Sequence, residues 1–514
     1  MTGLEIKKGG TKMKKRVLVL VLAVAMCLMA FGCGKKESGP SGKVDENGVT
    51  LDEITLTFWH IEDETTINML AEKFMEKYPN ITVECRVIED MATDLSAAAQ
   101  AGTFPDVFEG TDSDTALANM YWRDISEYWN NDPETKNLMA TVNEYGIGCF
   151  DTDKRYAAPM ICWPCAVFID RNVVKTLNLE MPRTDWTWDE MIDLIKKATV
   201  DPGAGQMKYF GLGALNRLDS LYGIAACSRA ERAIKGEFGF DGNDFDLSYW
   251  AVGEQQFSDL KLGGYCAPET ETQEMEDWTG DWEEWFGATG HVAVFSEGFW
   301  TFQNIWGNGT YQEERGLDIV PYVTPNVVDE KEHNVIANMY MGGVSDSCKY
   351  PYEAYLLLKF MGWGIDGWKA RLEIYQDETI TNAAGVPLKN SQMPMPMTLN
   401  EEIWTGYKAL FPQDEEHKPY WDAFFDSITR PVPYGWYSIA GYWNFCDQYF
   451  NKIGIHDLVD NGTAKAADYV VEATEQANYY HAEAMIDYFG PDGYNVLSEE
   501  ELAKYQAVVD AFAQ

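Results

Sequence analysis

Along the chain, the spacing of hydrophobic residues switches between the two-residue repeat of a strand and the repeat of a helix. In ITLTFWH, Ile54, Leu56 and Phe58 are separated by single threonines, and this two-residue period predicts a strand. Apolar residues then recur at helical spacing over residues 67–78, and Pro79 ends that pattern. The following ITVECRVI returns to strand alternation. Because strand–helix–strand units cross over right-handed, this segment predicts neighbouring parallel strands.

The alternation of strand and helix continues beyond this unit. The stretch MATDLSAAAQAG predicts a second helix that ends at Gly102, and PDVF predicts the next buried strand. Further along, Thr187 and Glu190 form a capping-box pattern at the start of a helix over TDWTWDEMIDLIKKAT. No period of about 20–50 residues repeats, which excludes solenoids and propellers. The pattern therefore predicts an α/β fold.

Size and charge narrow the class of protein. A chain of 514 residues exceeds the size at which one core keeps growing, so two lobes or domains are expected. The 82 acidic and 40 basic residues give a formal net charge of -42, and such a surface repels nucleic acid and anionic lipid headgroups. The chain is also rich in aromatic residues, with 18 Trp, 28 Tyr and 24 Phe, more than core packing alone usually requires. Some of these rings are expected to line a site.

The N-terminus has the pattern of a secretion signal. Basic residues 14–16 precede an apolar run over residues 17–31, which is shorter than the roughly 20 residues that a membrane helix needs. The run ends in MAFGCGKK, which resembles the lipobox of bacterial lipoproteins, whose cysteine, here Cys33, carries the lipid. We expect residues 1–32 to be removed and the polar residues 33–49 to form a flexible tether. Ordinary signal cleavage without lipidation is the alternative.

The remaining cysteines are scattered and do not suggest a disulfide scaffold. They are Cys85, Cys149, Cys162, Cys165, Cys227, Cys266, Cys348 and Cys446. Thiols in an exported chain are easiest to keep in an anaerobic Gram-positive bacterium, which is the expected source. The stretch KKGGTKM reads like a translated ribosome-binding site before a start codon, so Met13 rather than Met1 is the expected initiator.

Seven segments resemble, in their order, the family 1 extracellular solute-binding proteins, which are the sugar-capturing subunits of ABC importers. The segments are ITLTFWH, FMEKYPNITVECRVI, AAAQAGTFPDVFEG, RYAAPMICWPCAVFIDRNVV, PRTDWTWDEMIDLIKKAT, GHVAVFSEGFW and NGTAKAADYVVEATEQAN. The resemblance implies a two-lobed periplasmic-binding-protein-like fold of type II, in which each lobe is a mainly parallel sheet flanked by helices and the ligand cleft lies between the lobes. It places residues 50–163 and 328–385 in the N-terminal lobe, and residues 164–327 and 386–514 in the C-terminal lobe.

The CWPC motif of residues 162–165 raises the question of redox or metal chemistry. A redox motif needs its first cysteine at a helix N-terminus, where the helix dipole lowers the thiol pKa, but apolar, strand-like residues surround this one. Zinc would need a second pair of ligands, and the six histidines show no paired spacing. We therefore interpret Cys162 and Cys165 as structural or cleft-lining residues, with a redox or metal site as the alternative. We interpret DGNDFD, residues 241–246, as a turn and not as a calcium loop.

The candidate ligand-binding residues follow predicted strands, because ligands bind outside the carboxyl ends of strands in open α/β sheets. On this ground the candidates are Trp59, His60, Glu62 and Asp63 after the first strand, Asp112, Ser113 and Asp114 after PDVFEG, and Trp163 at the crossing between lobes. The family resemblance adds Trp300 with its neighbour Glu297, and the aromatic pair Trp436 and Tyr437. For the aromatic residues the alternative is ordinary core packing, and for the acidic residues it is a solvated surface charge.

The function that follows is a monomeric, lipid-anchored receptor on the extracellular face of the cytoplasmic membrane. It would capture a carbohydrate, which we expect to be an oligosaccharide, by closing its lobes, and would deliver it to the transmembrane permease of an ABC transporter. No cofactor, metal or nucleic acid is expected, and the common nucleotide-binding, zinc-protease and serine-hydrolase motifs are missing from the sequence. Two alternatives stay open: an anchored glycoside hydrolase, since acidic residues are abundant, and a binding protein for a non-sugar solute.

Overall fold

The computed structural model describes most of the chain after residue 41. The described residues are 42–110, 113–140, 142, 154–203, 206–213, 238–268, 290–299, 316–327, 335–390, 393–428, 431–433 and 439–512. The chain divides into two compact units, Met1–Asp52 and Glu53–Gln514. In the described part of the first unit, Val44 and Thr50 form an isolated antiparallel bridge around a turn. Within the described ranges, no helix has the length and apolar character needed to cross a membrane.

The first strands and helices of the second unit form where the hydrophobic pattern predicts them. Strands β1, β2 and β3 span Ile54–His60, Ile81–Val87 and Val107–Gly110. Helices α2 and α3 span Glu64–Lys77 and Met91–Ala101. The strand pairs β1–β2 and β1–β3 are both parallel, as predicted. The helix end at Gly102 is also confirmed, because Gly102 has a φ of 69° in the left-handed region that glycine adopts without strain.

The remaining strands complete a mixed sheet. Strands β4 to β9 span Ala158–Asp170, Phe210–Gly213, Val292–Gly298, Ile319–Tyr322, Val335–Val344 and Pro431–Pro433. The strand order is β2-β1-β3-β8-β4-β6-β5, with β7 paired to β4 and β9 paired to β8. Pairing is parallel in β1–β2, β1–β3, β5–β6 and β8–β9. It is antiparallel where β8 pairs with β3 or β4, and where β4 pairs with β6 or β7. Parallel pairs therefore lie at both ends of the strand order, and β9 adds one more on the central strand β8.

Strand β4 belongs to both halves of the sheet. Its residues 158–164 pair with β8, whereas residues 165–169 pair with β6 and residues 167–170 with β7. All of its residues are buried, which fits a strand enclosed on both faces. The segment after β8 contacts both halves as well, since the Met395 amide donates to the Cys162 carbonyl at 2.7 Å while α16 packs on β7. The lobe boundaries proposed from the sequence stay a prediction.

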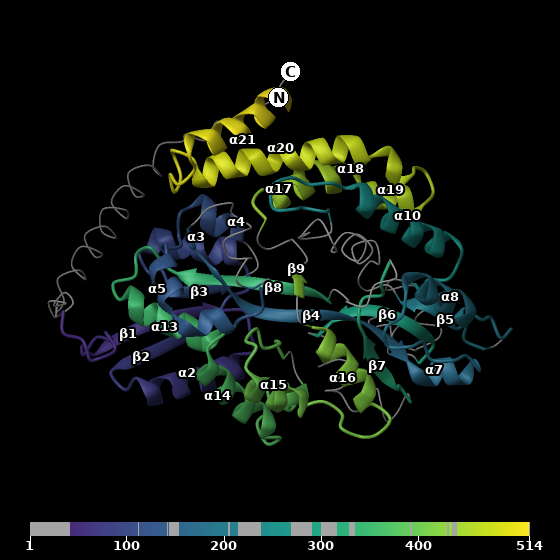
Figure 1. The fold of residues 1–514 in the computed structure, drawn as a ribbon, viewed down its shortest axis with the longest axis horizontal. Coiled ribbons are helices and arrows are strands. Elements are labelled where there is room, and N and C mark those ends of the chain that lie inside the picture. Colours follow the sequence, from purple (N-terminus) through teal and green to yellow (C-terminus); the bar gives the residue numbers. More distant parts are fainter. Residues whose placement is uncertain are drawn as a thin grey trace, which may run out of the picture. The chain divides into compact units, whose positions relative to one another are not determined.

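Helices flank the sheet (Figure 1). After α2 and α3, the described helices up to residue 300 are α4 Ser113–Ala118, α5 Ser126–Asn131, η1 Pro133–Asn137, α7 Arg171–Thr176, α8 Trp188–Ala198 and α10 Ser248–Leu262. Those that follow are α13 Pro351–Met361, α14 Ile365–Gln376, η5 Leu388–Asn390, α15 Glu401–Lys408, α16 Lys418–Ser427, α17 Tyr442–Phe445, η6 Cys446–Phe450, α18 Asn451–Ile453, α19 Ile455–Asp460, η7 Ala466–Asp468, α20 Val470–Phe489 and α21 Glu499–Phe512. The predicted capping box at the start of α8 is confirmed, with Thr187 and Glu190 exchanging hydrogen bonds.

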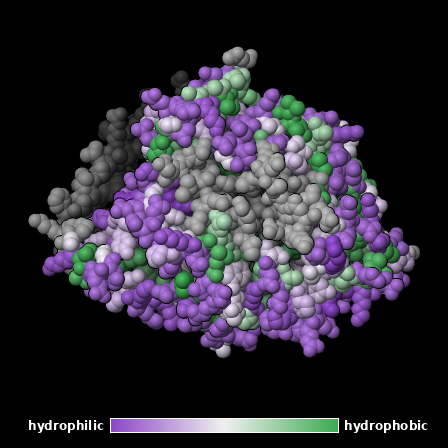
Figure 2. Space-filling view, viewed as in Figure 1, coloured by the Kyte–Doolittle hydropathy of each residue, from purple (hydrophilic) through white to green (hydrophobic). Residues whose placement is uncertain are grey.

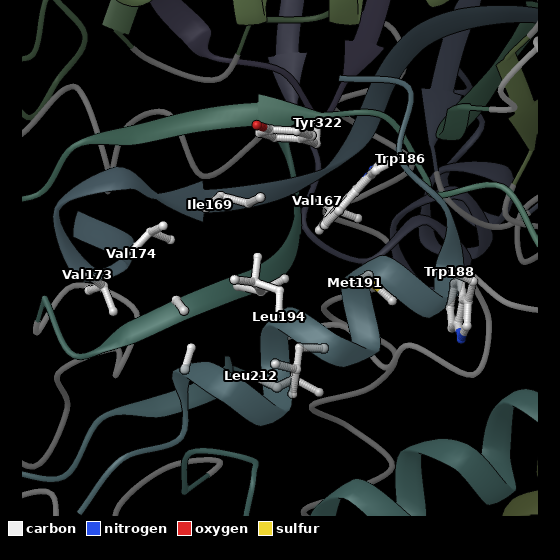
Figure 3. Close-up of a cluster of buried hydrophobic side chains, with 14 of the residues drawn as sticks. Val167, Ile169, Val173, Val174, Trp186, Trp188, Met191, Leu194, Leu212 and Tyr322 are labelled. Carbon is white, nitrogen blue, oxygen red and sulfur yellow. The ribbon is translucent and has the colours of Figure 1, made fainter. Parts of the chain in front are cut away.

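A hydrophobic core fixes α8 against the second half of the sheet (Figure 3). Val167 and Ile169 of β4 face Met191 and Leu194 of α8 across this core. Trp186 is fully buried there, and its indole N–H donates to the Val323 carbonyl at 2.9 Å, so the ring adds apolar area without leaving a polar atom unpaired. The described surface in Figure 2 is mostly hydrophilic, with small separate hydrophobic patches.

Candidate ligand-binding site

Four of the predicted site residues lie at the end of β1 or in the loop that follows it, and the first two are part of the strand itself. Trp59 and His60 are consecutive in β1, so their side chains point to opposite faces of the sheet. Trp59 is 7% exposed, and the Arg86 guanidinium lies 4.2 Å from its ring centroid while also pairing with Asp94. One face of the indole is therefore covered by a cation–π contact. His60 is fully buried, and this burial lowers its pKa to about 4, so the ring is neutral at pH 7.

Both carboxylates of the same loop have internal partners. The two oxygens of Glu62 accept hydrogen bonds from the Arg371 guanidinium of α14, at 2.7 and 3.0 Å. Asp63 is the N-cap of α2 and accepts from the backbone N–H and the hydroxyl of Thr66. These contacts give each acidic residue a structural role. A role of Glu62 or Asp63 in ligand binding stays a prediction.

Another buried acidic residue, Glu109, lies close to Glu62, and it was not among the residues predicted from the sequence. It lies in β3 with no exposed surface, and its Oε1 atom accepts from the Ile61 amide at 3.4 Å. Burial, followed by the nearby charge of Glu62, holds the pKa of Glu109 well above its usual range. A signal was present in the sequence, since VFEG places a carboxyl inside a run that otherwise reads as a fully buried strand.

One of the site residues predicted after β3, Asp114, is hydrogen-bonded to a segment far away in the sequence. Ser113 and Asp114 begin α4, and Ser113 is buried. Asp114 accepts a hydrogen bond from the Gly441 amide at 3.4 Å, directly before α17. The predicted aromatic pair Trp436 and Tyr437 precedes Gly441 in the sequence, but both lie outside the described residues, as do Asp112, Trp300 and the lipidation candidate Cys33.

Trp163 lies where β4 crosses between the halves of the sheet. It is opposite Asn338 of β8, and its ring meets Tyr340 edge-on with 5.1 Å between centroids. Asn338 and Tyr340 are further candidates that sequence reasoning missed, although an Asn inside the apolar run VIANMYM was a visible signal. Glu297 of β6 is opposite Ala166, so it lies on the other face of the sheet from Trp163. Its Oε1 atom accepts from the Gly298 amide at 2.8 Å.

The CWPC motif is part of β4, as its apolar surroundings predict. Cys162 and Cys165 are both buried, and burial raises the pKa of each thiol well above its usual range. A raised pKa disfavours the thiolate that redox exchange and metal binding require. Residues three apart in a strand point to opposite faces, so the two thiols do not face one another. In the ranges that the structure describes, no group of three or more His, Cys, Asp or Glu residues could hold a metal ion.

The predicted turn over residues 241–246 is confirmed. Asp241 accepts from the backbone amides of Asn243 and Asp244 through one carboxylate oxygen. The Asn243 side chain in turn accepts from Lys504 of α21 at 3.0 Å. These contacts account for the polar residues of this segment as a capped turn.

The two halves of the sheet share strand β4. The sequence model for bacterial extracellular solute-binding proteins matches residues 59–362. The chain therefore belongs to the family of bacterial extracellular solute-binding proteins. That family and the structural neighbours described below are substrate-binding proteins and not enzymes. No curated protein sequence matches the chain.

Solved structures share this fold at low sequence identity. An ABC substrate-binding protein from Listeria monocytogenes in complex with cycloalternan has a TM-score of 0.58 and 17% identity, covering 83% of this chain and 98% of that one. The sugar-binding protein MalE from Xanthomonas citri has a TM-score of 0.59 and 14% identity, covering 84% and 98%. A solute-binding protein from Thermotoga lettingae bound with alpha-D-tagatose has a TM-score of 0.57 and 16% identity, covering 83% and 99%. These likenesses show that the chain has the two-lobed periplasmic-binding-protein fold.

Proposed function

We propose that this protein captures a carbohydrate outside the cell and delivers it to the permease of an ABC importer. The observation that carries the proposal is the family match over residues 59–362. Two of the structures above bind cycloalternan and alpha-D-tagatose, and a cyclo/maltodextrin-binding protein with a TM-score of 0.55 and 16% identity binds maltotetraose. These ligands support a carbohydrate as the ligand class. A formal net charge of -42 also favours a neutral, hydroxyl-rich solute over an anionic one.

A panel of ligands tests the proposed ligand class. We expect one or more sugars in a panel of cycloalternan, maltotetraose, tagatose and common monosaccharides to raise the melting temperature, because a ligand that binds only the native state stabilises it by mass action. Sulfate, phosphate and amino acids serve as non-sugar controls. Chromatography of the sugar after incubation separates the two classes of protein. A sugar that is recovered intact supports a receptor, whereas a cleaved sugar would identify a glycoside hydrolase, and a shift only with a non-sugar solute would refute the ligand class.

The aromatic residues proposed to clamp the sugar are Trp300, Trp436 and Tyr437, with Trp59, Trp163 and acidic neighbours completing the site. A pyranose has apolar C–H faces and a rim of hydroxyls, so it binds between flat rings with polar acceptors at the edges. Replacing Trp300 or Trp436 with Ala is expected to weaken binding by about 1–3 kcal/mol, as for other aromatic anchors, measured by calorimetric titration. Trp443→Ala is the matched control, since Trp443 packs on the core around α17. Equal losses in all three variants would place the ligand elsewhere.

We also propose that lipid on Cys33 tethers the protein to the membrane, with residues 33–49 as a spacer. The support is the lipobox-like MAFGCGKK after an apolar run, in a family whose members act outside the cell. Cys33→Ala is expected to move the protein from the membrane fraction into the medium, because a protein domain without its acyl chains has no stable hold on a bilayer. Fractionation and immunoblotting measure this, with Cys85→Ala as control. A Cys33→Ala variant that stays with the membrane would contradict the proposed anchor.

A further inference from the structure

Arg371 has more buried hydrogen bonds than an ordinary ion pair requires. It projects from α14, its side chain is 2% exposed, and its two terminal nitrogens hold both oxygens of Glu62. One of these nitrogens also donates to the Met361 carbonyl at 3.1 Å, and the other to the Tyr375 hydroxyl at 3.2 Å. A guanidinium that donates in two directions at once is fixed in a single orientation, which a lysine ammonium cannot reproduce.

Through Glu62, Arg371 is hydrogen-bonded to the loop between β1 and α2. Glu62 is in the middle of this loop, and on its N-terminal side the Ile61 amide donates to Glu109. The His60 carbonyl accepts from the Ile88 amide at 2.8 Å, and Asp63 caps α2 on the other side. The loop is therefore attached to β3, to the end of β2, to α2 and to α14. Of these attachments, the Glu62–Arg371 pair is the one made by two opposite charges.

We propose that Arg371 is a positioning residue that fixes the β1–α2 loop in the conformation needed to bind the solute. The proposal rests on the proposed function, since this loop is one of the strand-end loops expected to contact the ligand. Loops at a ligand site are drawn from the least stable parts of a fold unless something holds them. A buried guanidinium at the loop's midpoint keeps its backbone ordered before the ligand arrives, so that binding does not have to order it.

The first arm of the test needs no ligand. In the full-length protein with Arg371→Lys, we expect hydrogen exchange of peptides covering residues 59–66 to become on the order of tenfold faster, with little change elsewhere in β1 or α14. Asp366→Asn is the matched control, because Asp366 pairs with Lys77 and so joins the same helices, α14 and α2, away from the loop. Tyr375→Phe removes one contact of Arg371 and provides a milder variant, with an expected acceleration of a few-fold. Unchanged loop exchange in both Arg371→Lys and Tyr375→Phe would overturn the proposal.

The second arm measures affinity and separates the two proposals. With maltotetraose as the probe, we expect Arg371→Lys to bind about tenfold more weakly and Asp366→Asn to bind within about twofold of the wild type. Full affinity together with a faster-exchanging loop would overturn the positioning role. If the wild type binds neither maltotetraose nor any other sugar of the panel, that result counts against the proposed ligand class, and the exchange measurement still decides whether Arg371 holds the loop.

Discussion

Replacing Arg371 with Met is expected to lower the free energy of unfolding by about 3–5 kcal/mol, because it leaves the Glu62 carboxylate buried without its counter-charge. Glu62 is 6% exposed and both of its oxygens depend on this guanidinium, so water cannot take over the lost hydrogen bonds without opening the loop. Urea denaturation followed by circular dichroism measures the change.

Two further variants separate the lost pair from lost packing. The double variant Glu62→Met/Arg371→Met removes both charges, so we expect it to recover most of the stability that Arg371→Met loses. Lys77→Met breaks the exposed pair with Asp366 and should cost less than about 1 kcal/mol. A double variant as unstable as Arg371→Met would contradict the buried-charge explanation and point to the volume or shape of the guanidinium.

The parts of the fold that could be predicted from the sequence are those set by local periodicity. The alternation in ITLTFWH and the capping box of Thr187 and Glu190 depend on residues within one element, and the structure has β1 and α8 at these positions. The parallel pairing of β1 with β2 and β3 also follows, because a strand–helix–strand unit has few ways to pack. The two-lobed fold required more than periodicity, and it came from the order of seven segments that resemble one family.

The mixed character of the sheet could not be predicted in the same way. Strand β8 pairs with β3, more than 200 residues earlier in the chain, and with β4, and neither strand carries a local mark of direction. The Glu62–Arg371 pair has a sequence separation of 309 residues, so no short-range pattern connects the two residues. The sequence predicts Glu62 as a ligand-binding residue, and in the structure both of its carboxylate oxygens accept from Arg371. The presence of an acidic residue in a sequence does not show whether its carboxylate binds a ligand or forms an internal ion pair.

The raised pKa of Glu109 predicts that the stability of the protein depends on pH. This pKa is well above its usual range because Glu109 is buried, and because Glu62 nearby already carries the negative charge that pairs with Arg371. The charged groups that act on its pKa are the Glu62 carboxylate, which raises it, and the Arg371 guanidinium, which lowers it. Burial and the nearby charge of Glu62 favour the protonated form of Glu109, and burial favours the neutral form of His60.

The sign of the pH effect follows from proton binding. Between the ordinary glutamate pKa, near 4.5, and the raised folded-state pKa, folded Glu109 keeps a proton that the unfolded chain releases. The contribution of Glu109 to stability is therefore complete below pH 4.5 and is lost as the pH rises, with a slope of up to about 1.4 kcal/mol per pH unit. His60 acts in the opposite direction and in a lower window, since its pKa of about 4 makes stability rise with pH between about 4 and 6.5.

Glu109→Gln is expected to remove the alkaline loss, because a neutral amide keeps the acceptor for the Ile61 amide and has no proton to release. The variant should match the wild type near pH 4 and become progressively more stable than it as the pH rises from 4.5 to the folded-state pKa of Glu109, while both retain the acidic limb due to His60. Urea denaturation at a series of pH values measures the difference, and Glu84→Gln on the exposed side of β2 is the control, expected to leave the profile unchanged. Parallel profiles for wild type and Glu109→Gln over the whole range would mean that Glu109 is ionised in the folded protein, and that Arg371 balances two carboxylates instead of one.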